Sequence, residues 1–110
     1  MIEKEILSDT DSIYNYYDGE KILGYLEIRL VDGVVDIMNI FVNEEDRRKG
    51  VATSLMNEMF EKENYSRIML EVNENNYGAI NLYNKLGFKE ISFRDRYYGD
   101  DTALIMEKVK

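Results

Sequence analysis

Cysteine, histidine and proline are all absent from this 110-residue chain. Without cysteine or histidine the protein has no disulfide, no thiolate nucleophile, no imidazole base and no thiolate or imidazole ligand for a metal. Any chemistry must therefore use carboxylates, tyrosines, lysines or hydroxyl groups, and no metal site is expected. Because proline is absent, turns have to be recognised from glycine, asparagine and aspartate.

Long apolar runs are also missing. No stretch approaches the roughly 20 apolar residues that a membrane-spanning helix needs, and residues 1–5 lack the basic-then-apolar order of a signal peptide. A cytoplasmic protein without a membrane partner is the expectation. The net charge of −8 opposes binding to nucleic acid, which is itself a polyanion. It suits a cationic acceptor, although acidic surfaces also serve solubility alone.

The remaining composition is that of an ordinary globular protein, with 45% hydrophobic and 33% charged residues. The length suffices for one modest core, so we expect one domain over residues 1–110. Two Asp-Gly pairs, at 18–19 and 32–33, mark tight turns. With the alternation of apolar and polar residues, they predict a first set of strands at residues 2–7, 12–17, 21–30 and 34–42.

After Gly50 the apolar residues recur at helical spacing, which predicts an amphipathic helix over residues 50–64. A second helix over residues 79–86 ends at Gly87, a residue suited to the position after a helix. The other predicted elements are strands at 67–72, 88–94 and 102–108. This order predicts an α/β (α+β) sandwich, in which a mixed, mostly antiparallel sheet contains a central parallel strand-helix-strand unit and carries two main helices.

Three cations, Arg47, Arg48 and Lys49, directly precede the first helix. The helix dipole already places positive charge there, so the arrangement is unfavourable unless an anion binds. Gly50 would let such an anion approach the backbone closely, and a pyrophosphate would fit. The alternative is that the acidic residues 44–46 neutralise the cations and the segment is a solvated loop.

The spacing of Arg47, Gly50 and Ala52 resembles the Arg/Gln-x-x-Gly-x-Gly/Ala signature of the GNAT superfamily of acyl-CoA-dependent acetyltransferases. It fits neither a Walker loop nor a Rossmann fingerprint. Downstream, the Leu-Glu-Val strand at 70–72, the Leu-Tyr and Leu-Gly-Phe sequences within 82–88 and a later pair of tyrosines are similar to the ribosomal-protein-alanine N-acetyltransferases. The similarity extends over about residues 20–108.

The resemblance implies acetyl-CoA as cofactor, Glu71 as general base and Tyr83 as proton donor to the leaving thiolate. It implies that Tyr97 and Tyr98 clamp the acceptor. The cofactor-binding residues that it implies are Ile40, Phe41, Val42, Arg47, Arg48, Lys49, Gly50, Val51, Ala52, Thr53 and Asn76.

The residues themselves also allow simpler roles. Glu71 lies in an apolar run, so we expect its carboxyl to be buried, as suits a base; the alternative is an outward-facing charge on an alternating strand. Tyr83 fits a core aromatic of a helix, and Asn76 fits a helix N-cap. Tyr97 and Tyr98 could equally pack on the sheet at the end of a strand.

The acceptor is less constrained than the cofactor. An α-amino group titrates near about 8 and a lysine near about 10.4, which favours a protein N-terminus over a lysine. The alternatives are a small amine, such as a polyamine or an aminoglycoside, and a non-catalytic acyl-CoA-binding module. Members of the superfamily usually have helices between the first two strands, whereas residues 8–11 alone connect them here. A homodimer that supplies the missing wall is one hypothesis.

Overall fold

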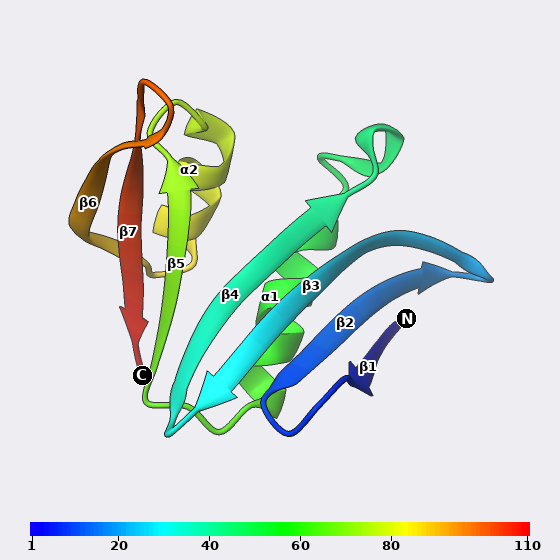
Figure 1. The fold of residues 1–110 in the computed structure, drawn as a ribbon. Helices are drawn as coiled ribbons and strands as arrows, with labels where there is room; N and C mark the ends of the chain where they lie inside the picture. The colour runs from blue at the N-terminus through cyan, green and yellow to red at the C-terminus, as the bar shows by residue number, and fades with distance from the viewer.

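The N-terminal half of the protein is an antiparallel meander of four strands (Figure 1). The computed structural model describes residues 1–110, apart from the side chain of Tyr98. Asp32 and Gly33 form the turn between the third and fourth strands with φ values of 51° and 79°, as a type I′ turn requires. The hairpins predicted around the two Asp-Gly pairs are thus confirmed. The strands are β1 (Ile2–Ile6), β2 (Asp11–Asp18), β3 (Lys21–Val31) and β4 (Val34–Val42).

The C-terminal half adds two helices and three strands to this sheet. The sheet order is β1-β2-β3-β4-β5-β7-β6, so β7 lies between β5 and β6. Only β4 and β5 run parallel, joined through the first helix. This is the mixed, mostly antiparallel sheet with two helices that the sequence predicts. The elements are η1 (Glu44–Asp46), α1 (Val51–Lys62), β5 (Arg67–Asn73), α2 (Tyr77–Lys85), β6 (Lys89–Tyr98) and β7 (Asp101–Val109).

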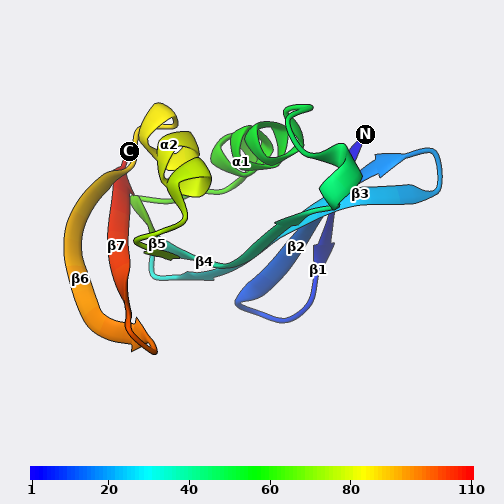
Figure 2. The ribbon, with the colours of Figure 1, turned by 90° about the horizontal axis from the view of Figure 1, so that it is seen from above.

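Both helices lie on the same face of the sheet, as the view from above shows (Figure 2). The buried face of α1 consists of Val51, Leu55, Met56 and Met59, and this spacing brings them onto one side of the helix. They pack with alternate residues of the strands, such as Leu26, to form the core. Neither helix is long and apolar enough to cross a membrane.

The connection between β1 and β2 is short. Residues 7–10 contain no helix, and the backbone N–H groups of Leu7 and Ser8 both donate to the carbonyl of Asp11. The absence of helices here was expected from the sequence. As a result, the described residues leave the sheet face opposite α1 and α2 without a helical cover (Figure 2).

The parallel pairing between β4 and β5 ends early. It comprises three residue pairs, which join Val34–Asp36 to Arg67–Met69. Beyond this point β4 contains a bulge at Met38, because Ile28 pairs with Ile37 while Glu27 pairs with Asn39. A bulge bends its strand, and the two strands diverge from there toward their C-terminal ends (Figure 1). The sheet is therefore open between the C-terminal ends of β4 and β5. It is continuous where the N-terminal ends of these strands pair.

A buried carboxylate ties the end of α1 to the N-terminal strands. Glu63 follows the last residue of α1 and is 8% exposed. It accepts a hydrogen bond from the hydroxyl of Tyr14 on β2 and forms an ion pair with Lys4 on β1, at 2.8 Å. Burial, together with the hydrogen bond to Glu63, raises the pKa of Tyr14. These contacts satisfy a charge that would be costly to bury alone.

Replacing Tyr14 by Phe should lower the free energy of unfolding by about 1–3 kcal/mol, because the Glu63 carboxylate loses a hydrogen bond inside the protein. Urea denaturation measures the change. The matched control is Tyr16→Phe on the same strand, since the Tyr16 hydroxyl has no hydrogen bond with a described residue. Equal stabilities of the two variants would contradict this account of Glu63.

Candidate active site

A cavity of about 580 Å³ lies where the end of β4 meets the first turns of both helices. We call it the helix-side cavity. Ten of the eleven cofactor residues implied by the resemblance line it, and so does Tyr83. Its lining residues are Ile40, Phe41, Val42, Asp46, Arg47, Arg48, Gly50, Val51, Ala52, Thr53, Asn76, Gly78, Ala79, Leu82 and Tyr83.

The start of α1 is built to leave backbone N–H groups free at this cavity. Gly50 is the N-cap residue, and no side chain caps the helix. Its φ of 81° lies in the left-handed region that glycine adopts without strain. The N–H groups of a first helical turn have no partner within the helix, and here no side chain takes them. The cavity therefore has the donors that an anion needs.

The three cations of the loop do not share one role. Lys49 is absent from the cavity lining and pairs with Asp46 at 3.2 Å. Asp46 is 3% exposed; burial acts to raise its pKa, but hydrogen bonds from Lys49 and Asn43 outweigh this and hold the pKa below its usual value. The alternative interpretation, in which acidic residues 44–46 neutralise the cations, therefore holds for Lys49.

The two arginines have no carboxylate partner among the described residues. Arg47 donates from Nε to the carbonyl of Val42 at 3.3 Å, and Arg48 forms no hydrogen bond or ion pair with a described residue. Arg48 has a positive φ of 65°, which is uncommon for a residue with a side chain. Both side chains are exposed at the cavity and are available to an anion.

Gly24 is a buried residue of β3 that pairs with Val42 at the end of β4. It was not identified from the sequence. A Cβ atom there would lie 2.6 Å from the carbonyl oxygen of Phe41 and 3.1 Å from a methyl group of Val51. Glycine therefore allows β3, the end of β4 and the start of α1 to approach closely. The period-two pattern of β3 could have drawn attention to a glycine inside a strand, which often marks such a close approach.

The second helix contributes an N-cap and a buried phenol. The side chain of Asn76 accepts a hydrogen bond from the N–H of Ala79 at 3.3 Å, so the N-cap role is confirmed, and Asn76 also lines the cavity. Tyr83 is 6% exposed and meets the ring of Phe88 edge-on, with centroids 5.8 Å apart. Burial raises the pKa of the Tyr83 phenol, which therefore keeps its proton at neutral pH.

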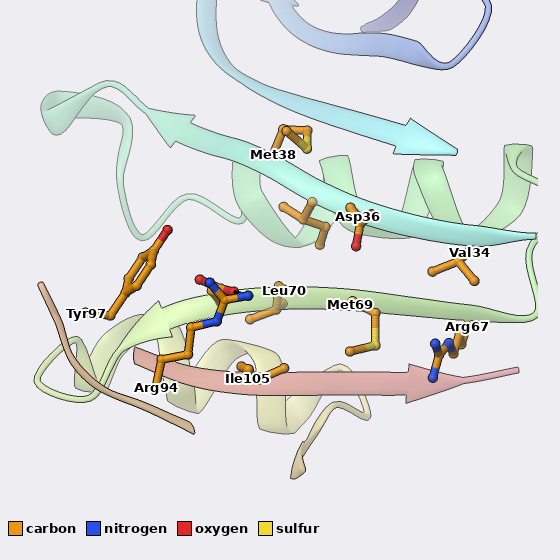
Figure 3. Close-up of a pocket in the computed structure, with 11 residues that line it drawn as sticks. Val34, Asp36, Met38, Arg67, Met69, Leu70, Arg94, Tyr97 and Ile105 are labelled. Atoms are coloured by element: carbon orange, nitrogen blue, oxygen red, sulfur yellow. Dashed lines mark ion pairs between the residues drawn. The ribbon is translucent and has the colours of Figure 1, made fainter. Parts of the chain in front are cut away.

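A second cavity, of about 760 Å³, lies along β4 and β5 beside the opening between them (Figure 3). We call it the sheet-side groove. Two carboxylates, Asp36 and Glu71, and two guanidinium groups, Arg67 and Arg94, line it. Arg67 is also paired with Glu107, at 2.9 Å. The other lining residues are Val34, Ile37, Met38, Met69, Leu70, Tyr97 and Ile105.

Glu71 faces this groove, and the expectation that it is buried is wrong. Along β5, Ile68, Leu70 and Val72 are buried, while Glu71 is exposed. The alternation of a strand places it on the opposite side from the core, as the alternative interpretation held. Its Oε1 atom forms an ion pair with Nη2 of Arg94 at 3.3 Å.

The tyrosine pair is only partly described. Tyr97 lines the groove, with the Arg94 guanidinium 5.3 Å from the centre of its ring. The side chain of Tyr98 lies outside the described part of the structure. Arg94 was not singled out from the sequence. Its position three residues before the tyrosine pair gave no chemical signal, because its partner Glu71 lies on a strand that is not its neighbour.

Comparison with known proteins gives a consistent picture. Residues 2–88 match the model of the acetyltransferase (GNAT) family. An N-alpha-acetyltransferase of Saccharolobus solfataricus is 40% identical over 93 residues, which are 77% of this chain and 56% of that protein. The [ribosomal protein bS18]-alanine N-acetyltransferase of Escherichia coli K12 is 35% identical over 77 residues, or 64% of this chain and 52% of that protein. The chain thus spans about half the length of these relatives.

Solved structures agree with the sequence comparison. The ribosomal-protein-S18-alanine N-acetyltransferase from Escherichia coli superposes with a TM-score of 0.87 at 25% identity, over 93% of this chain and 70% of that one. A putative streptothricin acetyltransferase from Bacillus anthracis, in complex with acetyl coenzyme A, gives 0.84 at 25% identity, over 96% of this chain and 65% of that one. The family match covers most of the chain, and the chain therefore belongs to the GNAT family of acetyltransferases.

Proposed function

We propose that the protein transfers an acetyl group from acetyl-CoA to the α-amino group at the N-terminus of a protein, with residues 1–110 acting as one domain. The observation that carries this proposal is the early end of β4–β5 pairing after three residue pairs. It opens the sheet beside both cavities, the helix-side cavity with the implied cofactor residues and the sheet-side groove with Glu71.

The helix-side cavity fits the chemistry of coenzyme A. Arg47, Arg48 and the free N–H groups after Gly50 would hold the pyrophosphate. Residues 40–42 lie beyond the last parallel pair with β5, so backbone groups on that edge of β4 can bind the amides of the pantetheine. Asn76 would add a side-chain hydrogen bond in addition to its N-cap role.

Acetyl-CoA supplies the acetyl group as an activated thioester. In the proposed mechanism Glu71 takes a proton from the acceptor ammonium, because an amine attacks only when it is neutral. A backbone N–H of residues 40–42 polarises the thioester carbonyl. Tyr83 donates a proton to the departing thiolate. A free thiol has a pKa of about 8.5 and a phenol about 10, and burial raises the pKa of Tyr83 further. Tyr83 therefore holds its proton at neutral pH and can supply it, although the transfer to the thiolate is itself uphill.

The ion pair between Arg94 and Glu71 in the groove supports a peptide N-terminus as acceptor. The chain as a whole has a net charge of −8, but the groove places a guanidinium group beside Glu71. This environment suits an acceptor with one positive charge better than a polycation. The names of the relatives, an N-alpha-acetyltransferase and a ribosomal-protein-alanine N-acetyltransferase, favour the same acceptor.

A small amine is the second candidate acceptor. The overall acidic charge would attract a polyamine or an aminoglycoside from solution. The uncovered sheet face beside the groove leaves access for such a compound. A homodimer in which a partner covers this face stays a hypothesis.

An acceptor panel distinguishes these candidates. We expect the protein and acetyl-CoA to acetylate peptides that begin with Ala or Ser, and spermidine at most weakly, as measured by release of free coenzyme A thiol and by mass spectrometry. Peptides with acetylated N-termini serve as the control, since they have no free α-amine. Turnover of spermidine alone would contradict the proposed acceptor. Binding of acetyl-CoA without turnover of any amine would indicate a non-catalytic module.

Replacing Tyr83 by Phe should lower kcat about 100-fold, because the leaving thiolate loses its proton donor. The KM for acetyl-CoA should stay within about threefold, since the ring remains in place. Tyr65→Phe is the matched control: Tyr65 is also buried, at 7% exposure, but does not line the cavity. A kcat of Tyr83→Phe equal to that of the control would exclude Tyr83 as the acid.

Replacing Arg48 by Gln should weaken coenzyme A binding about five- to tenfold, because a charge without a protein partner is removed from the phosphate site. Isothermal titration calorimetry measures the Kd, and the difference should shrink as salt is added. Lys49→Gln is the matched control, because it also removes one positive charge from the loop, but Lys49 is paired with Asp46. It should change the Kd less than about twofold. Equal effects of both substitutions would contradict the division of roles in the loop.

A further inference from the structure

The carboxylate of Glu71 is held by a residue that is distant in the sheet. Glu71 on β5 pairs with Ile105 of β7, and Arg94 on β6 pairs with Ala103 of β7. Strands two apart in a sheet lie about 10 Å from each other, a span that a long side chain such as arginine can bridge. Figure 3 shows Arg94 extending from β6 across β7 toward β5. Its Nη2 atom ends 3.3 Å from Oε1 of Glu71.

Arg94 is itself held in place. Its guanidinium lies 5.3 Å from the centre of the Tyr97 ring, a geometry at which the ring attracts a cation. The register of β6 against β7 shifts between Arg94 and Tyr98, and Arg96 in this stretch has a positive φ of 54°. This local shape of β6 brings Tyr97 back against Arg94. The guanidinium is thus fixed between an aromatic ring and a carboxylate.

Arg94 is the ion-pair partner of Glu71 among the described residues. Nη2 of Arg94 lies 3.3 Å from Oε1, and no described residue donates a hydrogen bond to the carboxylate. The Glu71 side chain is 30% exposed, so without Arg94 nothing described would fix its rotamer. A base has to lie within hydrogen-bond reach of the proton that it takes. The ion pair anchors the carboxylate here, and its exposed part is available to an acceptor in the groove.

We propose that Arg94 is a positioning residue, which anchors the Glu71 carboxylate so that it receives the proton of the acceptor amine. This inference rests on the proposed acetyl transfer with Glu71 as base. Arg94 acts through Glu71 and does not bind the acetyl donor, since it is not part of the helix-side cavity. The competing explanation is a purely structural contact between β5 and β6. The two explanations predict different effects of an Arg94 substitution on kcat.

The experiment compares Arg94→Gln, Arg94→Lys and wild type with acetyl-CoA and the Ala-starting peptide. We expect Arg94→Gln to lower kcat about tenfold, because Glu71 loses its ion-pair partner. The KM for acetyl-CoA and the melting temperature should remain near the wild-type values. Arg94→Lys should recover part of kcat, because the positive charge is kept while the planar fork is lost. Added ethylguanidinium should restore activity to Arg94→Ala.

Arg29→Gln is the matched control. Arg29 is also an exposed arginine paired with a carboxylate, Asp11, at 2.8 Å, but it lies outside the groove lining. Its substitution should leave kcat unchanged. A wild-type kcat in Arg94→Gln, or a loss that follows the melting temperature and is not rescued by ethylguanidinium, would overturn the positioning role. Failure of the wild type to acetylate the peptide would overturn the proposed function, and this inference with it.

Discussion

The parallel pairing between β4 and β5 is the contact on which the site depends. Where it exists, over three residue pairs, it joins the meander to the C-terminal half of the sheet. Where it ends, the two strands turn backbone groups toward a gap that no described strand fills. The bulge at Met38 accounts for this change, because an extra residue in β4 alters the direction of the strand without breaking its pairing with β3. A fully paired sheet would be more regular, and it would separate the two cavities.

The charged residues differ in whether they are buried and already paired within the protein. Asp46 and Glu63 are the buried carboxylates, and each is held by a lysine and by an uncharged donor. Arg47 and Arg48 are exposed and have no carboxylate partner among the described residues. The net charge of −8 therefore gives little information about either cavity. What a ligand meets is decided by which charges are already neutralised within the protein.

Much of the fold follows from local patterns in the sequence. The Asp-Gly turns, the helical period after Gly50 and the end of the second helix at Gly87 each specify a backbone conformation within a few residues. The basic loop at residues 47–50, proposed to bind the cofactor, could be found for the same reason, since its residues are contiguous. The burial of Glu71 could not be judged locally. Its apolar neighbours in the sequence point to the opposite side of β5, so a continuous apolar run was taken for a buried environment.

The partner of Glu71 also lay beyond sequence reasoning, and this follows from the position of β7 between β5 and β6. None of the proposed catalytic or cofactor residues belongs to β7, yet the strand sets the distance between Glu71 and Arg94. During synthesis, β7 is made after every other element of the sheet. A nascent chain that already contains Glu71, Tyr83 and residues 47–50 still lacks the strand that sets the distance from Glu71 to Arg94. The contact between these two side chains therefore requires β7 to be paired with both of its neighbours.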